Sequence, residues 1–271
     1  VALSGSPIAG PGVDESKLPP PDRGADGIGI VDVATLKLQK ILRGITDPEQ
    51  LAVSHDGKRL YVASEDSGQA IVLDAQTGAT VAKLAVGDEP EGVTISPDGK
   101  AVYVTSESDH KISVIDTVSA KVVASVPVGQ RPRVIEFTDD GARAFVSNET
   151  DGSITVVDAR KHAAVGTFKL EGGPLIRPVG LAASHDGKRL YVATGRGSSV
   201  VMLDAQTGKQ LASAAVGQRP WGIALSADGK RLYTANGPSN DVTVLDAATL
   251  KVLGKVAVGE SPWGLVVGRS R

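Results

Sequence analysis

Charged and aromatic side chains recur beside a repeated proline, and they are the residues of this sequence best suited to hold a small molecule. The prolines are Pro48, Pro90, Pro132, Pro178, Pro220 and Pro262, separated by 42, 42, 46, 42 and 42 residues. Acidic neighbours of these prolines are Asp47, Glu49, Glu89 and Glu91, basic ones are Arg131, Arg133, Arg177 and Arg219, and the two tryptophans are Trp221 and Trp263. Guanidinium groups bind carboxylate or phosphate through paired N–H donors, and tryptophan offers a flat apolar surface. Together they suit a planar, anionic small molecule.

Two interpretations of these residues stay open. In one they form a ligand-binding channel mouth, to which Asn236 from a loop on the same face is added. In the other the arginines and glutamates only pair with one another and the tryptophans pack beneath loops. An enzyme would need a general base here, and Glu89 or Glu91 would be the candidates, with or without a cation.

Other residue types give little reason to expect catalysis or a metal site. The histidines are His55, His110, His162 and His185, and they fall in turns and loops on different faces, so no histidine metal site is expected. The chain has no cysteine, which excludes disulfides and thiolate ligands. A net charge of −2 argues against a nucleic-acid binder, and no apolar run reaches the ~18 residues needed to span a bilayer.

The elements that must position these residues repeat with the same period. Asp-Gly pairs stand at 56–57, 98–99, 140–141, 186–187 and 228–229, and a second aspartate recurs at 32, 74, 116, 158, 204 and 246. A constant period of this size indicates one supersecondary unit copied in tandem. We expect the repeated aspartates to cap turns, because their carboxylates can accept backbone N–H groups.

One repeat predicts four strands. Short runs rich in Val, Ile and Tyr cover 92–95, 101–105, 112–115 and 121–128, and Gly, Pro, Asp and Ser separate them. The runs are apolar on both faces, and a lone sheet would leave an apolar face exposed to water. Radial stacking buries both faces and protects the edges. The sequence therefore predicts an all-β fold, a β-propeller of four-stranded antiparallel blades, forming one domain over residues 1–271.

Five repeats are complete, and a sixth blade would be closed by strands from both chain ends. The complete ones cover 50–87, 92–129, 134–170, 180–217 and 222–259. The sixth would combine 1–4, 29–33 and 38–42 with a closing strand at 264–267. This gives six blades in the chain as given, with seven in a longer parent as the alternative. A long loop insertion at 5–27 and four extra residues near 171–178 fall on one face, which we therefore expect to be the functional one.

The repeats resemble the YVTN β-propeller family. The naming motif lies at Tyr61–Ser64, Tyr103–Ser106, Phe145–Asn148, Tyr191–Thr194 and Tyr233–Asn236. More narrowly, the segments 5–22, 128–133, 217–222 and 236–241 are similar to β-propeller proteins associated with PQQ-dependent catabolism.

That resemblance implies a periplasmic or secreted, non-catalytic binding or scaffold protein in quinoprotein alcohol oxidation. Its partner would be a quinoprotein dehydrogenase or a c-type cytochrome, and its ligand a small anion such as PQQ. The alternative is a lactonase-like hydrolase with a carboxylate base or a metal at the channel mouth. The resemblance brings no catalytic residue to this chain.

Overall fold

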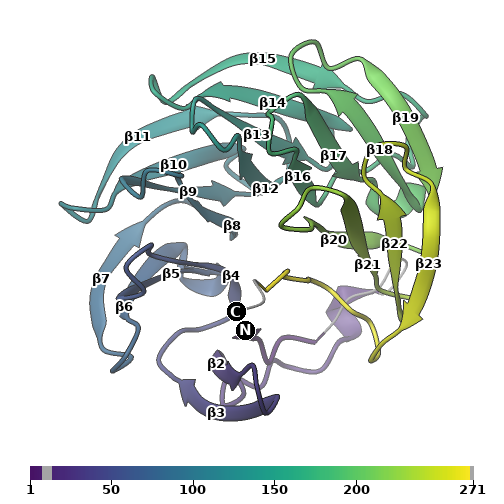
Figure 1. Cartoon of the computed structure of the whole chain (residues 1–271). Helices are drawn as coiled ribbons and strands as arrows, with labels where there is room; N and C mark the ends of the chain where they lie inside the picture. Colours follow the sequence, from purple (N-terminus) through teal and green to yellow (C-terminus); the bar gives the residue numbers. More distant parts are fainter. Residues whose placement is uncertain (8–13, 269–271) are drawn as a thin grey trace.

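Six antiparallel sheets stand around a central axis in the computed structural model, which describes residues 1–7 and 14–268 (Figure 1). Five sheets have four strands each, and the sixth has three, in the order β1-β2-β3. In each four-stranded blade the strands follow chain order from the axis outward. The predicted all-β propeller with six blades is thereby confirmed.

Strands in equivalent places have nearly the same length in every blade. The innermost strands are β4 (Pro48–Val53), β8 (Pro90–Ile95), β12 (Pro132–Phe137), β16 (Leu181–Ala183) and β20 (Pro220–Leu225). The second strands are β5 (Arg59–Ser64), β9 (Ala101–Ser106), β13 (Arg143–Asn148), β17 (Arg189–Ala193) and β21 (Arg231–Asn236). The third strands are β6 (Gln69–Asp74), β10 (Lys111–Asp116), β14 (Ser153–Asp158), β18 (Ser199–Asp204) and β22 (Asp241–Asp246). The outer strands are β7 (Thr80–Ala85), β11 (Lys121–Pro127), β15 (Ala163–Lys169), β19 (Gln210–Ala215) and β23 (Val252–Ala257).

The sixth sheet consists of β1 (Ala2–Leu3), β2 (Gly27–Asp32) and β3 (Lys37–Leu42), so the N-terminal contribution to this blade is confirmed. The closing strand expected at 264–267 is not formed, because no residue from 258 to 268 lies in a strand. The backbone of Trp263, Gly264 and Leu265 instead lies against Gly222 of β20. These residues are thereby held beside β20, away from the edge of β1, which is itself only two residues long.

Within residues 1–7 and 14–268, helical structure is limited to three single turns of 3-10 helix: η1 (Glu15–Lys17), η2 (Glu65–Ser67) and η3 (Gly195–Gly197). Among the described residues, no helix has the length and apolar character that a membrane crossing would require.

The core lies between blades: apolar clusters join each sheet to the next along the chain, from β1–β3 through to β20–β23. In β10 the four consecutive residues Ile112 to Ile115 are all buried. Tyr103, Ile112 and Val114 of one blade pack with Ile135 and Phe137 of the next. Packing of one sheet on its neighbour thus holds the ring together, as expected when apolar residues occupy both faces of a strand.

The turns at one end of each blade are built by the repeated aspartates. Asp74, for example, accepts the backbone N–H of Thr77 at 2.9 Å and its hydroxyl at 2.9 Å. The equivalent carboxylate accepts an N–H in every blade, at Asp32, Asp116, Asp158, Asp204 and Asp246. The structural role predicted for these aspartates is confirmed, and it leaves the opposite face for function.

Candidate functional site

An interruption of the innermost strand directs side chains toward the channel. Pairing with the second strand breaks directly after the proline and resumes three residues later, as between Pro90 and Val93. The same break follows Pro48, Pro132 and Pro220. A bulge of this kind turns the extra residues away from the ladder. The residue after each of these four prolines is therefore free to contact its counterparts in neighbouring blades.

The register of each blade brings a second residue to the same place. Because Pro90 pairs with Ser106 in an antiparallel ladder, Glu107 follows directly opposite Glu89. The backbone N–H of Glu107 donates to the carbonyl of Glu89 at 2.9 Å, and the same bond joins Glu65 to Asp47 and Glu149 to Arg131. The mouth thus receives two tiers of side chains, one from the bulge and one from the start of the loop after the second strand.

The residue before each proline has a left-handed backbone in five of the six repeats. These residues are Asp47, Glu89, Arg131, Arg219 and Ser261, with φ between 45° and 56°. Side-chain-bearing residues rarely adopt this conformation, and it clusters at functional sites.

Arg133 is the centre of a buried ion-pair network. Its Nε donates to Glu149 Oε2 at 2.8 Å, and its Nη1 lies 3.1 Å from Glu91 Oε2 and also contacts Glu107. Only 8% of the Arg133 side chain is exposed. Burial alone would lower the pKa of Arg133, but the three carboxylates raise it above the ordinary value. The predicted pairing of arginine with glutamate is therefore real on this side of the mouth.

Arg131 lies above this network at the rim. Its Nε donates to Glu107 Oε2 at 2.7 Å and lies 3.6 Å from Glu149 Oε2, while half of its side chain stays exposed. Burial raises the pKa of Glu107 to about 7, against the opposing effect of Arg133. Burial also raises the pKa of Glu91.

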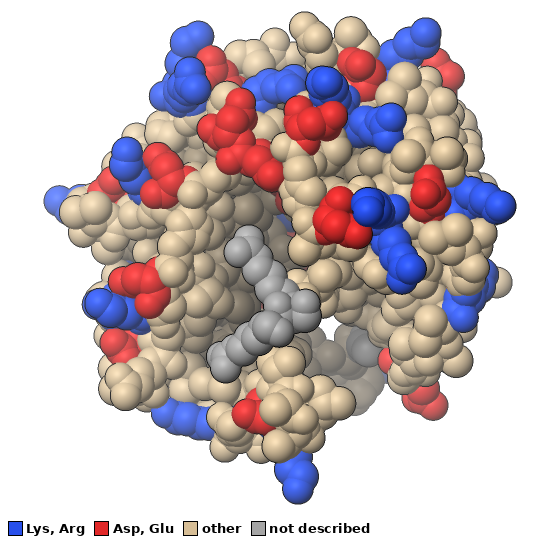
Figure 2. Space-filling model, in the orientation of Figure 1, with Lys and Arg blue, Asp and Glu red and all other residues tan. Residues whose placement is uncertain are grey.

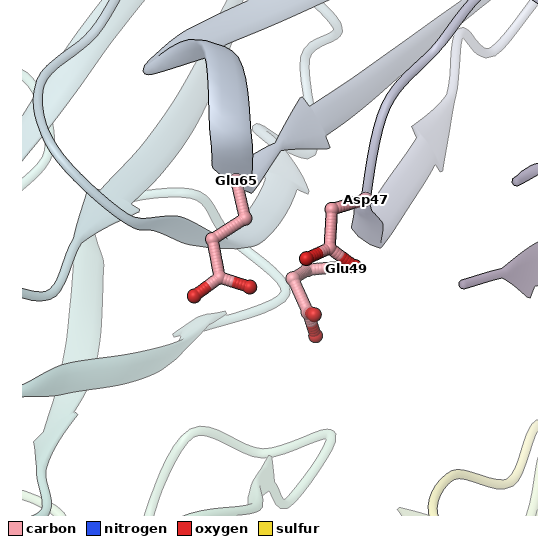
Figure 3. Close-up of side chains that lie close together, drawn as sticks. All are labelled: Asp47, Glu49 and Glu65. Carbon is pink, nitrogen blue, oxygen red and sulfur yellow. The ribbon is translucent and has the colours of Figure 1, made fainter. Parts of the chain in front are cut away.

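Three further carboxyl groups gather where no arginine of the network reaches. Asp47, Glu49 and Glu65 turn their carboxyl groups into one space (Figure 3), and one oxygen of each lies within 4.8 Å of the others. Burial, together with the charges of Glu91, Glu65 and Asp47, raises the pKa of Glu49 to about 9. Burial and then Asp47 also raise the pKa of Glu65. Like charges this close cannot all ionise, so Glu49 keeps its proton near neutral pH. We call these three residues the carboxyl cluster.

The tryptophans meet on the opposite side of the mouth. Trp221 and Trp263 are stacked with ring centroids 4.0 Å apart and planes inclined by 29°. The guanidinium groups of Arg133 and Arg219 lie 5.2 Å and 5.3 Å from the centroid of the Trp221 ring. Figure 2 shows charges of both signs distributed around the ring and a hollow at its centre.

Comparison with known proteins places the fold in a family. The family model described as "Lactonase, 7-bladed beta-propeller" matches residues 116–252, just over half of the chain. This chain belongs to the Lactonase, 7-bladed beta-propeller family. The match includes Arg131, Arg133, Glu149 and Trp221 of the mouth, whereas the carboxyl cluster of this lactonase-family protein precedes it.

A solved structure supports the fold of this lactonase-family protein. The hydrazine synthase of Kuenenia stuttgartiensis superposes with a TM-score of 0.79 at 24% sequence identity, covering 88% of this chain and 82% of that one. At this identity the likeness shows the fold alone. The search of curated proteins found no match. The narrower resemblance to YVTN-repeat, PQQ-associated proteins stays a prediction, since none of the comparisons names it.

The N-terminal insertion of the lactonase-family chain reaches the carboxyl cluster. Arg23 lies 2.6 Å from Asp66, 3.4 Å from Asp47 and 3.5 Å from Asp26. The Asp26 side chain accepts the backbone N–H of Asp47 at 2.9 Å. Ser4 and Ser6 donate their hydroxyls to the Asp47 carboxylate, the latter at 2.7 Å. Residues 8–13 of the predicted 5–27 loop lie outside the described residues.

Not every predicted ligand residue lies at the centre of the mouth. Asn236 is fully buried inside its own blade, where its amide donates to Asp241 and to Thr243 at 2.8 Å. Arg177 donates to the backbone carbonyl of Thr150 at 3.1 Å. Glu89 is at the rim and accepts the hydroxyl of Ser108 at 2.5 Å.

Sequence reasoning gave too little weight to Glu65, Glu107 and Glu149. The signal was present, since these glutamates are separated by 42 residues and follow equivalent second strands. Carboxylates in loops are usually solvated, but here the register of the blade turns all three inward. The same periodicity does not extend to Arg23, which was missed for lack of any pattern.

Two cavities mark the two faces. One of about 330 Å³ lies at the rim, between Glu89, Ser108 and His110 of one loop and Gln130, Arg131 and Thr150 of the next. A larger one of about 420 Å³ lies at the opposite end of the blades, among the aspartate turns, where Tyr103 bonds His162 Nδ1 at 2.7 Å. The carboxylates around the larger cavity are already used as turn caps. We therefore place function at the mouth.

Proposed function

We propose that this protein hydrolyses a lactone at the channel mouth, with Glu49 and Glu65 acting as an acid–base pair. The observation that carries the proposal is the carboxyl cluster, in which two half-buried glutamates lie close together and burial and mutual repulsion raise the pKa of each. Membership of the lactonase propeller family supports the reaction class. Fold alone would not, because propellers serve many functions.

The chemistry requires one group to take a proton and another to give one. The ionised carboxylate of the pair removes a proton from water as the water oxygen attacks the lactone carbonyl carbon. The protonated carboxyl then gives its proton to the ring oxygen as the carbon–oxygen bond breaks, which yields a hydroxy acid. A pKa of about 9 keeps Glu49 protonated near neutral pH, so Glu49 is the natural acid and Glu65 the base.

The two bases suggested by sequence are less well placed. Glu91 is buried and ion-paired with Arg133 at 3.1 Å. Glu89 is at the rim and holds the Ser108 hydroxyl. Glu49 and Glu65 are partly exposed and lack an arginine partner among the described residues, so their oxygens are available to substrate and water.

The carboxyl cluster also has the ligand type that hard cations prefer, since Mg²⁺ and Ca²⁺ bind carboxylate oxygens. A cation there would activate water directly, in place of a carboxylate base. Assays with added divalent cation and with chelator separate these two versions of the same reaction.

The test is a pH-stat assay of ring opening on a panel of γ- and δ-lactones, corrected for spontaneous hydrolysis. We expect Glu49→Gln and Glu65→Gln each to lower kcat/KM by about 10²–10⁴-fold, the usual contribution of a general acid or base. Glu171→Gln, at an exposed glutamate away from the cluster, is the matched control. A rate at background level, or one that both cluster variants leave unchanged, rules the proposal out.

The non-catalytic binding or scaffold role in PQQ-dependent alcohol oxidation stays a prediction from the resemblance alone. A lactone-hydrolysis rate that depends on Glu49 would displace it.

A further inference from the structure

We propose that the Trp221 ring binds a planar aromatic carboxylate, which takes the place of Trp263 and pairs with Arg219. The site lies at the same mouth as the carboxyl cluster but uses different residues. It does not rest on the proposed hydrolysis.

The first observation is that the Trp263 ring covers one face of the Trp221 ring and can be displaced from it. Trp221 is 6% exposed, whereas Trp263 is 46% exposed. Trp263 belongs to the segment 258–268, which has no strand pairing. Offset stacking of two aromatic rings is favourable but modest, so another flat ring can replace it at little net loss. The Trp263 side chain can leave without breaking any ladder.

The second observation is an unsatisfied donor. The indole Nε1 of Trp221 is buried and has no hydrogen-bond acceptor in the described part of the chain. Buried polar groups are nearly always paired, because leaving one unpaired costs its full desolvation. A ligand oxygen beside the ring would supply the missing acceptor. Since the atom is covered in this structure, a neighbouring group must move before a ligand oxygen at the edge of the ring reaches it.

The third observation is an arginine without a counter-ion. Arg219 lies 5.3 Å from the Trp221 centroid, and no acidic side chain of the described residues lies within ion-pair distance of it. Burial, and then the charges of Arg196, Arg133 and Arg131, lower the pKa of Arg219, although Glu149 opposes this. Arg133 already satisfies three glutamates, so Arg219 is the guanidinium available to an anion.

These observations specify the ligand class. A flat aromatic body matches the place of the Trp263 indole, and a carboxylate matches both the planar fork of Arg219 and the orphaned indole N–H. A neutral aromatic ligand would lack the ion pair with Arg219. A non-aromatic carboxylate would lack the stacking on the Trp221 ring.

The two tryptophans make the test direct, because a ¹⁵N-labelled sample has only two indole N–H signals. The probes are 2-naphthoate, its neutral amide 2-naphthamide and the non-aromatic cyclohexanecarboxylate. We expect naphthoate to shift both signals saturably, with the Trp221 signal moving as its N–H gains an acceptor. The two other probes should bind at least about tenfold more weakly, since each lacks one of the two interactions.

Two variants test the geometry. Arg219→Gln should weaken naphthoate binding by about tenfold or more, while the control Arg59→Gln, at an arginine paired with Asp74 in the turn face, should leave it unchanged. Trp263→Ala should strengthen binding by about threefold to tenfold, because the ligand no longer displaces a ring. Weaker binding to Trp263→Ala, or equal binding of naphthoate and naphthamide, would overturn the proposal. So would naphthoate binding that Arg219→Gln does not change.

Discussion

Arg133 and Glu149 belong to the same blade, and the Arg133 Nε donates to Glu149 Oε2 at 2.8 Å inside a buried network. Removal of the guanidinium in Arg133→Met would leave Glu149, Glu91 and Glu107 without their shared partner. We expect a loss of about 3–5 kcal/mol in the free energy of unfolding, as for one partner of a buried ion pair. Urea unfolding measures it, and Arg59→Met, at a partly exposed pair, should cost less than about 1 kcal/mol.

The loss in the free energy of unfolding caused by Arg133→Met should depend on pH. Without the guanidinium, Glu91 and Glu107 bind protons more readily in the folded state, because Arg133 is the charge that opposes the rise of their pKa values, so the variant should recover stability as the pH falls from 8 to 5. A loss of the same size at both pH values, or one below 1 kcal/mol, would contradict the network described above.

Glu49 gives the second prediction, through the pH dependence of stability. Its pKa is raised from 4.5 to about 9, so over this window the folded state binds more protons at Glu49 than the unfolded state does. The contribution of Glu49 to stability is therefore fully present below pH 4.5 and is lost as the pH rises toward 9. Glu49→Gln should stabilise the protein relative to wild type at pH 9 and much less at pH 5. Thermal unfolding across this range checks it, and parallel curves for the two proteins would show the pKa to be ordinary.

Glycines of the innermost strands give the third prediction. A Cβ at Gly92 would lie 2.1 Å from the carbonyl oxygen of Arg133 in the next blade, and one at Gly180 would lie 2.3 Å from that of Trp221. Gly92→Ala should therefore destabilise the ring by about 1–3 kcal/mol through overpacking. Gly166→Ala, in the exposed outer strand β15 with no atom within 4 Å, is the control and should gain up to about 1 kcal/mol. Equal unfolding midpoints for the two variants would argue against close approach of the inner strands.

Arg23 gives the fourth prediction, on the N-terminal insertion. Arg23→Gln removes the cation that lies 2.6 Å from Asp66 and 3.4 Å from Asp47. We expect faster amide exchange at Gly5 and Asp47, whose N–H groups donate to the Asp26 side chain beside Arg23. Lys17→Gln, at an exposed pair with Asp14 in the same insertion, should leave exchange unchanged. Equal amide exchange rates in Arg23→Gln and Lys17→Gln would contradict this role of Arg23.

The blades were predictable because every strand pair within a complete blade joins neighbours in sequence. A hairpin such as β9–β10 needs only its own alternation and turn residues, and these repeat with the period. Ring closure has no such local signal. The sixth blade depends on β1 meeting β2 across the insertion, and the closing strand expected at 264–267 has no partner edge that the sequence reveals, because β1 stops after two residues.

The site was predictable in position but not in its chemistry. The repeated proline correctly pointed to Arg133, Glu91 and the tryptophans as neighbours. The sequence could not show that a bulge and its register bring Glu65 beside Glu49, nor that burial would raise the pKa of both. Those properties arise from distances between strands, which residue types alone do not fix.

The left-handed residue before five of the six repeated prolines has a broader consequence. The same backbone conformation carries a carboxylate at Asp47 and Glu89, a guanidinium at Arg131 and Arg219, and a hydroxyl at Ser261. The backbone at this position therefore accepts side chains of different charge and chemistry. The ligand specificity of such a ring can therefore change one blade at a time, through substitution of single side chains that leaves the backbone unchanged.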